Sequence, residues 1–242
     1  MRYGIFADIH ANLEALEAVF VAYSKEQIDK YLCAGDIVGY ASNPKECIEK
    51  IEGISAIIVA GNHDWASANL FSLDYFNDLA KEAIFWTKEN LSESNQQFLQ
   101  GLKLTYKNQD LTLVHSTLDN PGDFNYLTDS YIAEETFRLM ETQICFLGHT
   151  HVPGVFIKKE DKRIIYCQEE NIHIHKDYKY IINVGSVGQP RDGIPYASYC
   201  IYDTQKKEVW IKRVAYDALT TRNKIIACGL PYFLGERLLI GR

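Results

Sequence analysis

Five of the seven histidines in this chain stand at the ends of short apolar runs, most of them beside a carboxylate, an amide or another histidine. Imidazole nitrogens together with carboxylate and amide oxygens form a ligand set that suits borderline and hard divalent metals. The motifs are Asp8-Ile9-His10, Gly35-Asp36, Gly61-Asn62-His63-Asp64, Val114-His115 and Gly148-His149-Thr150-His151. They contain too many ligands for one ion of ordinary coordination number and enough for two, so the sequence predicts a hydrolase with two metal ions.

The spacing within these motifs divides the side chains between two ions. Asp8 and His10 are two residues apart, so an extended chain turns both to the same side and lets them bind one ion. His151 repeats this spacing after His149 and could return to the first ion. Asp36 has two carboxylate oxygens, which can bridge a metal pair about 3.5–4 Å apart. We expect a carbonyl oxygen and two ring nitrogens to hold the second ion, namely those of Asn62, His115 and His149.

The first third of the chain alternates strands and helices. Short apolar runs predict strands at Tyr3–Ala7, Tyr31–Ala34 and Ala56–Ala60. Asn12 precedes an amphipathic helix as its cap, and Asn43-Pro44 opens a second helix with asparagine at the cap and proline at the first helical position. This alternation predicts a parallel sheet with helices packed on it, and hence an α/β fold.

The rest of the chain becomes richer in strands. Two helices are expected between Leu73 and Leu102, and a third at Ile132–Met140. After His151 a run of strands suggests a second, largely antiparallel sheet within one domain that spans residues 1–242. These later strands and the tail helices are expected at Leu111–His115, Ile144–Leu147, Val155–Ile157, Arg163–Cys167, Ile172–His175, Tyr180–Asn183, Ser198–Tyr202 and Val209–Val214, and at Ala218–Cys228 and Leu234–Ile240.

Candidate metal ligands follow directly on several of the predicted strands. In open α/β sheets, ligands bind just beyond the carboxyl ends of the strands. Residues that are far apart in the sequence should therefore meet along one edge, which supports the metal site independently of residue type. The residues in question are Asp8, Asp36, Asn62, His115 and His149.

Composition narrows the class of protein. The net charge of −7 is spread without long acidic runs, so no basic face for a nucleic-acid polymer is expected, while a nucleotide-sized substrate is not excluded. The six cysteines form no Cys-x-x-Cys motif, which favours a reduced, cytoplasmic protein. The first motif starts at Asp8, so no signal peptide is expected. No apolar run approaches the ~18–20 residues of a membrane span, so no membrane association is expected.

The ordered motifs resemble those of the calcineurin-like metallophosphoesterase superfamily. Asp-x-His, Gly-Asp, Gly-Asn-His-Asp, a later histidine and Gly-His-x-His occur in that order between Asp8 and His151. The segment from Asn183 to Gly193 is similar to one in the small bacterial and archaeal branch of the superfamily. The resemblance implies an α/β fold of two packed mixed β-sheets flanked by helices, a four-layer sandwich.

The resemblance also implies roles for individual residues. His63 would be the general acid for the leaving alkoxide, and Asp64 would hydrogen bond to its imidazole and orient it. Asn12 would lie near the substrate phosphate, although helix capping alone would explain it. Arg191 is either a bidentate phosphate clamp or a turn residue. The implied ligands are Asp8, His10, Asp36 and His151 for one ion, and Asp36, Asn62, His115 and His149 for the other.

Together the ligands and the resemblance predict a metal-dependent phosphoesterase for small phosphate mono- or diesters, including nucleotides. A hydroxide that bridges two divalent ions would attack phosphorus in line with the leaving group. Manganese is the favoured metal, with iron, zinc, nickel and magnesium as alternatives. Two other functions stay open, a protein phosphatase of the same fold and a non-catalytic metal-binding scaffold. Scaffold relatives typically lose the acid histidine or several ligands, whereas all of them are present here.

The remaining signals concern specificity. Ser116 and Val184 stand where glycine and proline are common in the branch, which leaves substrate preference open. The loop Thr117–Leu127 follows a ligand histidine, a position that often shapes specificity. His173 and His175 alternate in a charged segment with no ligand motif beside them and are expected on a strand face or in solvent, outside the site. Four aromatic residues could stack on a base or an aromatic leaving group, or simply pack in the core, namely Tyr40, Trp65, Phe124 and Tyr126.

Overall fold

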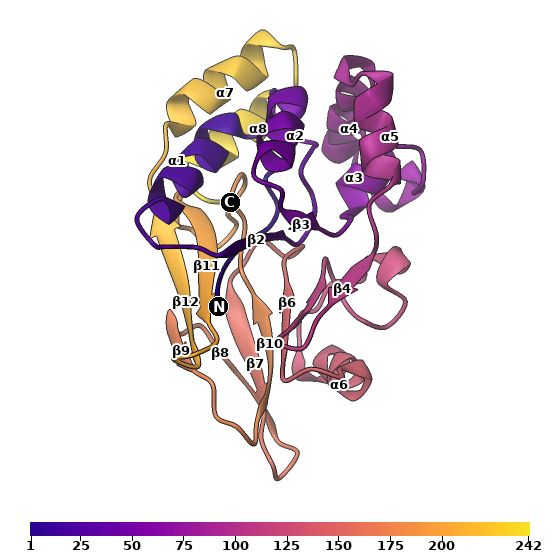
Figure 1. Cartoon of the computed structure of the whole chain (residues 1–242). Coiled ribbons are helices and arrows are strands. Elements are labelled where there is room, and N and C mark those ends of the chain that lie inside the picture. The colour runs from indigo at the N-terminus through magenta and orange to yellow at the C-terminus, as the bar shows by residue number, and fades with distance from the viewer.

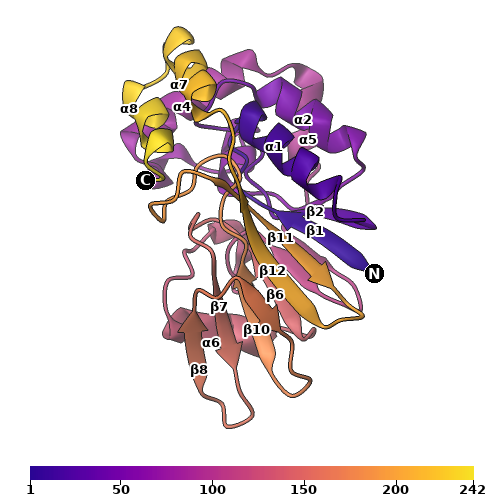
Figure 2. The same ribbon diagram turned by 90° about the vertical axis from the view of Figure 1, so that its left-hand side faces the viewer.

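The computed structural model describes the whole chain, residues 1–242, and contains two six-stranded sheets packed face to face. Figure 2 shows the sheet that contains β1 and β2 above the sheet that contains β6 and β10. A continuous apolar core fills the space between them, with Tyr3 and Leu32 from one sheet and Phe146 and Ile182 from the other. Two twisted sheets that share one core in this way form a sandwich.

The first sheet is mixed, with the strand order β3-β2-β1-β11-β12-β9. Its first three strands are parallel, as the alternation of strands and helices predicts. The other three strands join them in antiparallel fashion. The bounds are β1 Arg2–Phe6, β2 Lys30–Cys33, β3 Ile57–Ile58, β9 Asn171–His173, β11 Ala197–Asp203 and β12 Glu208–Val214.

The second sheet is also mixed, with the order β4-β5-β6-β10-β7-β8. Its middle strands β5, β6 and β10 are parallel, and the outer pairings are antiparallel. The expected antiparallel sheet built from the strands after His151 is therefore wrong, because these strands are divided between both sheets. Side-chain alternation specifies which face of a strand is buried, not which strand lies beside it. The bounds are β4 Thr105–Lys107, β5 Thr112–Val114, β6 Ile144–Leu147, β7 Gly154–Lys158, β8 Ile164–Cys167 and β10 Lys179–Asn183.

Helices cover the outer faces of both sheets and complete the four layers that the resemblance implies (Figure 1). Leu16 of α1 and Ile48 of α2 pack on Phe6 of the first sheet. Phe137 of α6 packs on Ile181 of the second sheet. None of the helices combines the length and apolar composition that crossing a membrane requires. The bounds are α1 Leu13–Tyr23, α2 Pro44–Gly53, α3 Asn62–Ser67, α4 Asp78–Asn90, α5 Glu93–Gln100, α6 Ser130–Leu139, α7 Ala218–Ala227 and α8 Tyr232–Glu236.

The predicted starts of α1 and α2 are found in the structure, but only α1 has the predicted side-chain cap. The Asn12 side chain accepts a hydrogen bond from the Ala15 amide at 3.1 Å, so the predicted cap of α1 is confirmed. Pro44 opens α2 as expected, but the Asn43 side chain makes no capping bond there. Its oxygen instead accepts a bond from Lys224 Nζ of α7, at 3.2 Å. The carboxyl-terminal helices thus pack back onto the loops that follow the first strands.

Candidate metal centre

The strand ends bring the predicted metal ligands together. Two buried groups of donor atoms share Asp36, and within each group the atoms lie within 4.8 Å of one another. The first group is Asp8, His10, Asp36 and His151, and the second is Asp36, His115 and His149. Asn62 joins the second group, because its Oδ1 lies 3.3 Å from His115 Nε2. These are the two sets that spacing and resemblance predict.

Short distances between donor atoms define the centre of each group. In the first, His10 Nε2 lies 3.0 Å from His151 Nε2 and 3.6 Å from Asp36 Oδ2. In the second, His115 Nε2 lies 3.0 Å from His149 Nδ1 and 3.4 Å from the same Asp36 oxygen. Asp36 Oδ2 therefore stands between the two groups, where one carboxylate can serve both.

Backbone carbonyls orient three of the imidazoles. Nδ1 of His10 bonds to the Val38 carbonyl at 3.2 Å, and Nδ1 of His115 bonds to the Ala34 carbonyl at 2.6 Å. Nδ1 of His151 bonds in the same way to the Gln189 carbonyl, at 2.6 Å. Because only an N–H can bond to a carbonyl, Nε2 of His10 and of His151 presents a lone pair to the centre, and Nε2 of His115 does so once it has lost the proton that it shares with Asp36, the arrangement typical of metal-binding histidines.

This donor set fits a divalent cation. The lone pairs of His10 Nε2 and His151 Nε2 face each other across 3.0 Å, which is repulsive unless a positive charge lies between them. Burial lowers the pKa of His10, His149 and His151, so that their rings are neutral, as a metal ligand must be. The chemistry of the side chains and their orientation thus agree on a metal site.

Charges within the cluster keep Asp36 ionised. Burial alone would raise its pKa, but His115 and His63 outweigh burial and hold the pKa of Asp36 well below its usual range. Conversely, burial lowers the pKa of His115, and Asp36 more than offsets this and raises it to about 9. A metal ion that binds here would displace the proton that these two residues share, so metal binding should release protons.

The backbone of the ligand loops is unusual. Five of the seven candidate ligands have φ between +49° and +67°, in the left-handed region: Asp8, His10, Asp36, His149 and His151. This region is uncommon for residues other than glycine, although aspartate and histidine tolerate it better than most. Such strained residues cluster at functional sites, where the surrounding structure holds them. Nothing in the sequence pattern had indicated this conformation.

Two motif glycines make space for ligand carboxylates. A Cβ atom at Gly61 would lie 2.0 Å from Asp36 Oδ1, and one at Gly148 would lie 2.3 Å from Asp8 Oδ2. Both distances are far below van der Waals contact. Glycine in Gly-Asn-His-Asp and in Gly-His-x-His is therefore required by the closeness of a neighbouring loop.

His63 is buried beside the first ligand group in an aromatic setting. Its ring centre lies 4.8 Å from that of His10, 4.4 Å from Tyr40 and 5.0 Å from Phe76. Its Nδ1 atom has no hydrogen-bond partner within the protein. Burial lowers the pKa of His63 to about 4, so the free protein holds this imidazole neutral.

Asp64 does not orient His63, and this expectation is wrong. Both carboxylate oxygens accept bonds from the backbone instead. Oδ2 accepts hydrogen bonds from the backbone amides of Asp36 and Gly61, at 2.8 and 3.0 Å. Oδ1 accepts hydrogen bonds from those of Ile37 and Val38, at 2.8 and 3.2 Å. A carboxylate in the first turn of a helix commonly reaches back to an amide in this way. Asp64 therefore joins the loop that carries Asp36 to the start of α3.

Asn12 and Arg191, the two residues expected near the substrate phosphate, have different surroundings in the structure. Asn12 is fully buried, donates to the Gly188 carbonyl at 2.8 Å and accepts bonds from Ala15 and Thr221, so its hydrogen bonds hold the fold together, and its contact with a phosphate stays a prediction. Arg191 lies at the site, with its guanidinium 5.7 Å from the centre of the Tyr40 ring. It bonds to Gln189 Oε1 at 2.7 Å.

Other residues singled out in the sequence can also be placed. His173 lies on the exposed face of β9, and His175 is exposed in the turn that follows it, so both lie outside the site as expected. Ser116 is buried next to His115, and its hydroxyl has no partner within the protein. Gln189 was missed, although it lies inside the segment from Asn183 to Gly193 that resembles the branch.

Comparisons with known proteins assign the family. A family model for the calcineurin-like phosphoesterase superfamily domain matches residues 1–207. An uncharacterized protein of Methanocaldococcus jannaschii is 41% identical over 242 residues, which cover 98% of this chain and 97% of the relative. The crystal structure of a metallophosphoesterase from Sphaerobacter thermophilus matches with a TM-score of 0.88 at 38% identity, over 100% of this chain and 99% of that one. The chain therefore belongs to the calcineurin-like phosphoesterase superfamily.

A more distant structure shows the same fold. A hypothetical protein from Pyrococcus horikoshii OT3 matches with a TM-score of 0.81 at 21% identity, over 100% of this chain and 98% of the other. The superfamily uses divalent metals, and the buried groups of histidine and aspartate in this chain are placed where they could bind them. The fold and the family that the motifs predict are thus both confirmed.

Proposed function

We propose that this protein is a dinuclear-metal phosphoesterase that hydrolyses small phosphate mono- or diesters. The observation that carries the proposal is the position of Asp36, whose Oδ2 lies 3.6 Å from His10 Nε2 of one ligand group and 3.4 Å from His115 Nε2 of the other. A shared carboxylate between two groups is what a metal pair about 3.5–4 Å apart requires. The complete ligand set and an intact His63 favour an enzyme over a non-catalytic scaffold.

Each ion has a defined set of protein ligands under this proposal. When bound, the metals would supply Lewis acidity toward the phosphate oxygens and would lower the pKa of water. The mixed oxygen and nitrogen ligands suit manganese, and iron, zinc, nickel and magnesium are alternatives. The ligands are Asp8, His10, Asp36 and His151 for the first ion, and Asp36, Asn62, His115 and His149 for the second.

The chain's own residues would act on the leaving group and on the phosphate. His63 would donate a hydrogen bond or a proton to the leaving oxygen, since it lies against His10 but is not part of either ligand group. Arg191 would bind a phosphate oxygen from above Tyr40, because a guanidinium presents several donors in a fixed plane. The burial of the cluster keeps bulk water away from these groups and strengthens their electrostatic effect.

Hydrolysis of p-nitrophenyl phosphate and bis-p-nitrophenyl phosphate tests the proposal. The protein would be stripped with a chelator, assayed, and assayed again after manganese is added back. Release of nitrophenol that depends on manganese is expected from at least one ester, and the ratio of the two rates would indicate monoesterase or diesterase character. No release from either ester, with two metals bound per chain, would count against the proposal.

A further inference from the structure

An aromatic cavity of about 240 Å³ opens directly beside the proposed metal centre. Its wall includes Asn62 and His149, which are proposed metal ligands, and His63, the proposed acid. A group bound in the cavity would therefore lie next to the metal centre. The cavity is smaller than the roughly 300–1,000 Å³ of pockets that enclose drug-sized ligands, so it suits one ring system rather than a peptide segment. Its aromatic lining comes from three separate loops and consists of Tyr40, Phe71, Tyr75, Phe76, Phe124 and Tyr126.

The rings around the cavity hold one another in place. Phe71 packs edge-on against Phe124, with ring centres 5.0 Å apart and an interplanar angle of 86°. Tyr126 stacks on His149 at 4.0 Å with an angle of 19°. Phe124 is buried and has φ of +51°, a conformation that a bulky side chain rarely adopts without constraint from its surroundings. The cavity is therefore preformed, which reduces the entropy lost when a ligand binds.

Polar side chains among these rings provide hydrogen-bonding groups. Asn77 uses its carbonyl oxygen to cap α4, accepting from the Ala80 amide at 3.0 Å, which leaves its N–H groups for a ligand. Asp123 and Asn125 also line the cavity and are exposed to solvent. Amide and carboxylate groups are the side chains that recognise base edges, whereas an alkyl leaving group would need none of them.

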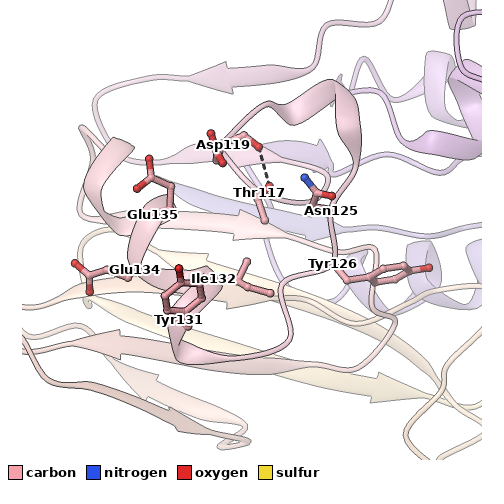
Figure 3. A pocket seen from close by; sticks show the side chains of 8 residues that line it. All are labelled: Thr117, Asp119, Asn125, Tyr126, Tyr131, Ile132, Glu134 and Glu135. Atoms are coloured by element: carbon pink, nitrogen blue, oxygen red, sulfur yellow. Dashed lines mark hydrogen bonds between the residues drawn. The ribbon is translucent and has the colours of Figure 1, made fainter. Parts of the chain in front are cut away.

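A larger cavity lies on the other side of the loop Thr117–Leu127, but its lining suits a phosphate ester less well. It has about 540 Å³, lies between the loop and α6, and shares Asn125 and Tyr126 with the aromatic cavity (Figure 3). Its wall carries three acidic side chains, of Asp119, Glu134 and Glu135, which would repel a phosphate ester. Figure 3 also shows that Tyr126 points away from α6, which places its ring on the side of His149.

We propose that the aromatic cavity binds the nucleobase of a nucleotide whose phosphate lies on the metal centre. The inference rests on the proposed function and specifies its substrate class. Aromatic rings give base stacking, and the amides of Asn77 and Asn125 offer partners for the base edge. The net charge of −7 disfavours a long polynucleotide, whereas a single nucleotide carries few charges to repel.

The test compares two competitors that share a ribose 5-phosphate group, only one of which carries a base. Adenosine 5′-monophosphate and ribose 5-phosphate would each be used to inhibit manganese-dependent hydrolysis of whichever p-nitrophenyl ester the protein cleaves. We expect the inhibition constant to be about 10-fold or more lower for the nucleotide, in keeping with the loss on removal of one stacking ring. Equal inhibition constants would overturn the inference while leaving the phosphoesterase activity established. Failure to cleave either p-nitrophenyl ester would instead count against the proposed function.

Variants of the cavity sharpen this test. Phe71→Leu should bring the ratio of the two inhibition constants close to one, because leucine fills space but cannot stack on a base. Phe85→Leu is the matched control, since Phe85 is exposed on α4 and does not line the cavity. If Phe71→Leu lowers the melting temperature strongly, Asn125→Ala in the exposed part of the loop replaces it, with a fall in the ratio again expected. An unchanged ratio in well-folded cavity variants would overturn the inference.

Discussion

The backbone N–H of His63 donates a hydrogen bond to Asp36 Oδ1 over 2.9 Å. The other oxygen of the same carboxylate stands between the two ligand groups, within 3.6 Å of His10 Nε2 and 3.4 Å of His115 Nε2. Asp36 therefore connects the proposed acid to the proposed bridging position. A change at either residue can be interpreted only if metal content and turnover are measured together.

Asp36→Asn should empty at least one metal site. The substitution keeps the shape of the side chain but removes the charge that both ligand groups share, and metal affinity depends on deprotonated ligands. We expect at most one manganese ion per chain, and a fall in kcat/KM of at least the roughly 100-fold that loss of an outer partner of a ligand can cost. Elemental analysis after loading and desalting gives the metal content. Asp177→Asn, at an exposed aspartate far from the centre, is the control. Two ions retained in Asp36→Asn would contradict the bridging role.

His63→Ala should separate turnover from metal binding. The imidazole lies outside both ligand groups, so the two ions should remain. Loss of a general acid typically lowers kcat by about 10²–10⁴-fold. The comparison is kcat and metal content of His63→Ala against His173→Ala, which removes an exposed imidazole on β9. Loss of metal together with activity would show that His63 is a ligand and not an acid.

Asp64→Asn should lower the stability of the protein more than it lowers the rate of hydrolysis. An amide in place of the carboxylate would turn its NH₂ group toward backbone N–H groups that now donate to Asp64. Leaving buried donors unpaired costs about 1–3 kcal/mol each, so the free energy of unfolding should fall by that order. Denaturant unfolding would measure this, and kcat at saturating manganese should fall by less than in His63→Ala. A large fall in kcat without loss of stability would restore the orienting role that the resemblance implies.

The ligand set could be predicted from the sequence because the chemistry and the local pattern coincide. Each apolar run that becomes β1, β2, β5 or β6 is followed within a few residues by a ligand motif. The expected single edge is wrong, because β1 and β2 belong to one sheet and β5 and β6 to the other, and the ligands meet where the carboxyl ends of the two sets of parallel strands come together. The environments of Asp64 and Asn12 could not be predicted in this way. Their partners Val38 and Gly188 are 26 and 176 residues away in the sequence, and hydrogen bonds of that range depend on the finished fold. The division of the later strands between the two sheets depends on the same long-range packing.

Removing the metal should lower the stability of the protein, and the loss should be larger the more tightly the metal binds. Without a cation, the lone pairs of His10 Nε2 and His151 Nε2 face each other at 3.0 Å beside the ionised and buried Asp36. A ligand that binds only the folded state stabilises it by about 2.7 kcal/mol when its free concentration is 100 times Kd. Calorimetric scans of the chelated protein should therefore show a lower Tm that rises as manganese is titrated back. The same titration of Asp36→Asn should give a smaller rise, because one site is already lost. A wild-type Tm that does not respond, with metal removal verified by elemental analysis, would show that the buried cluster is not a metal site.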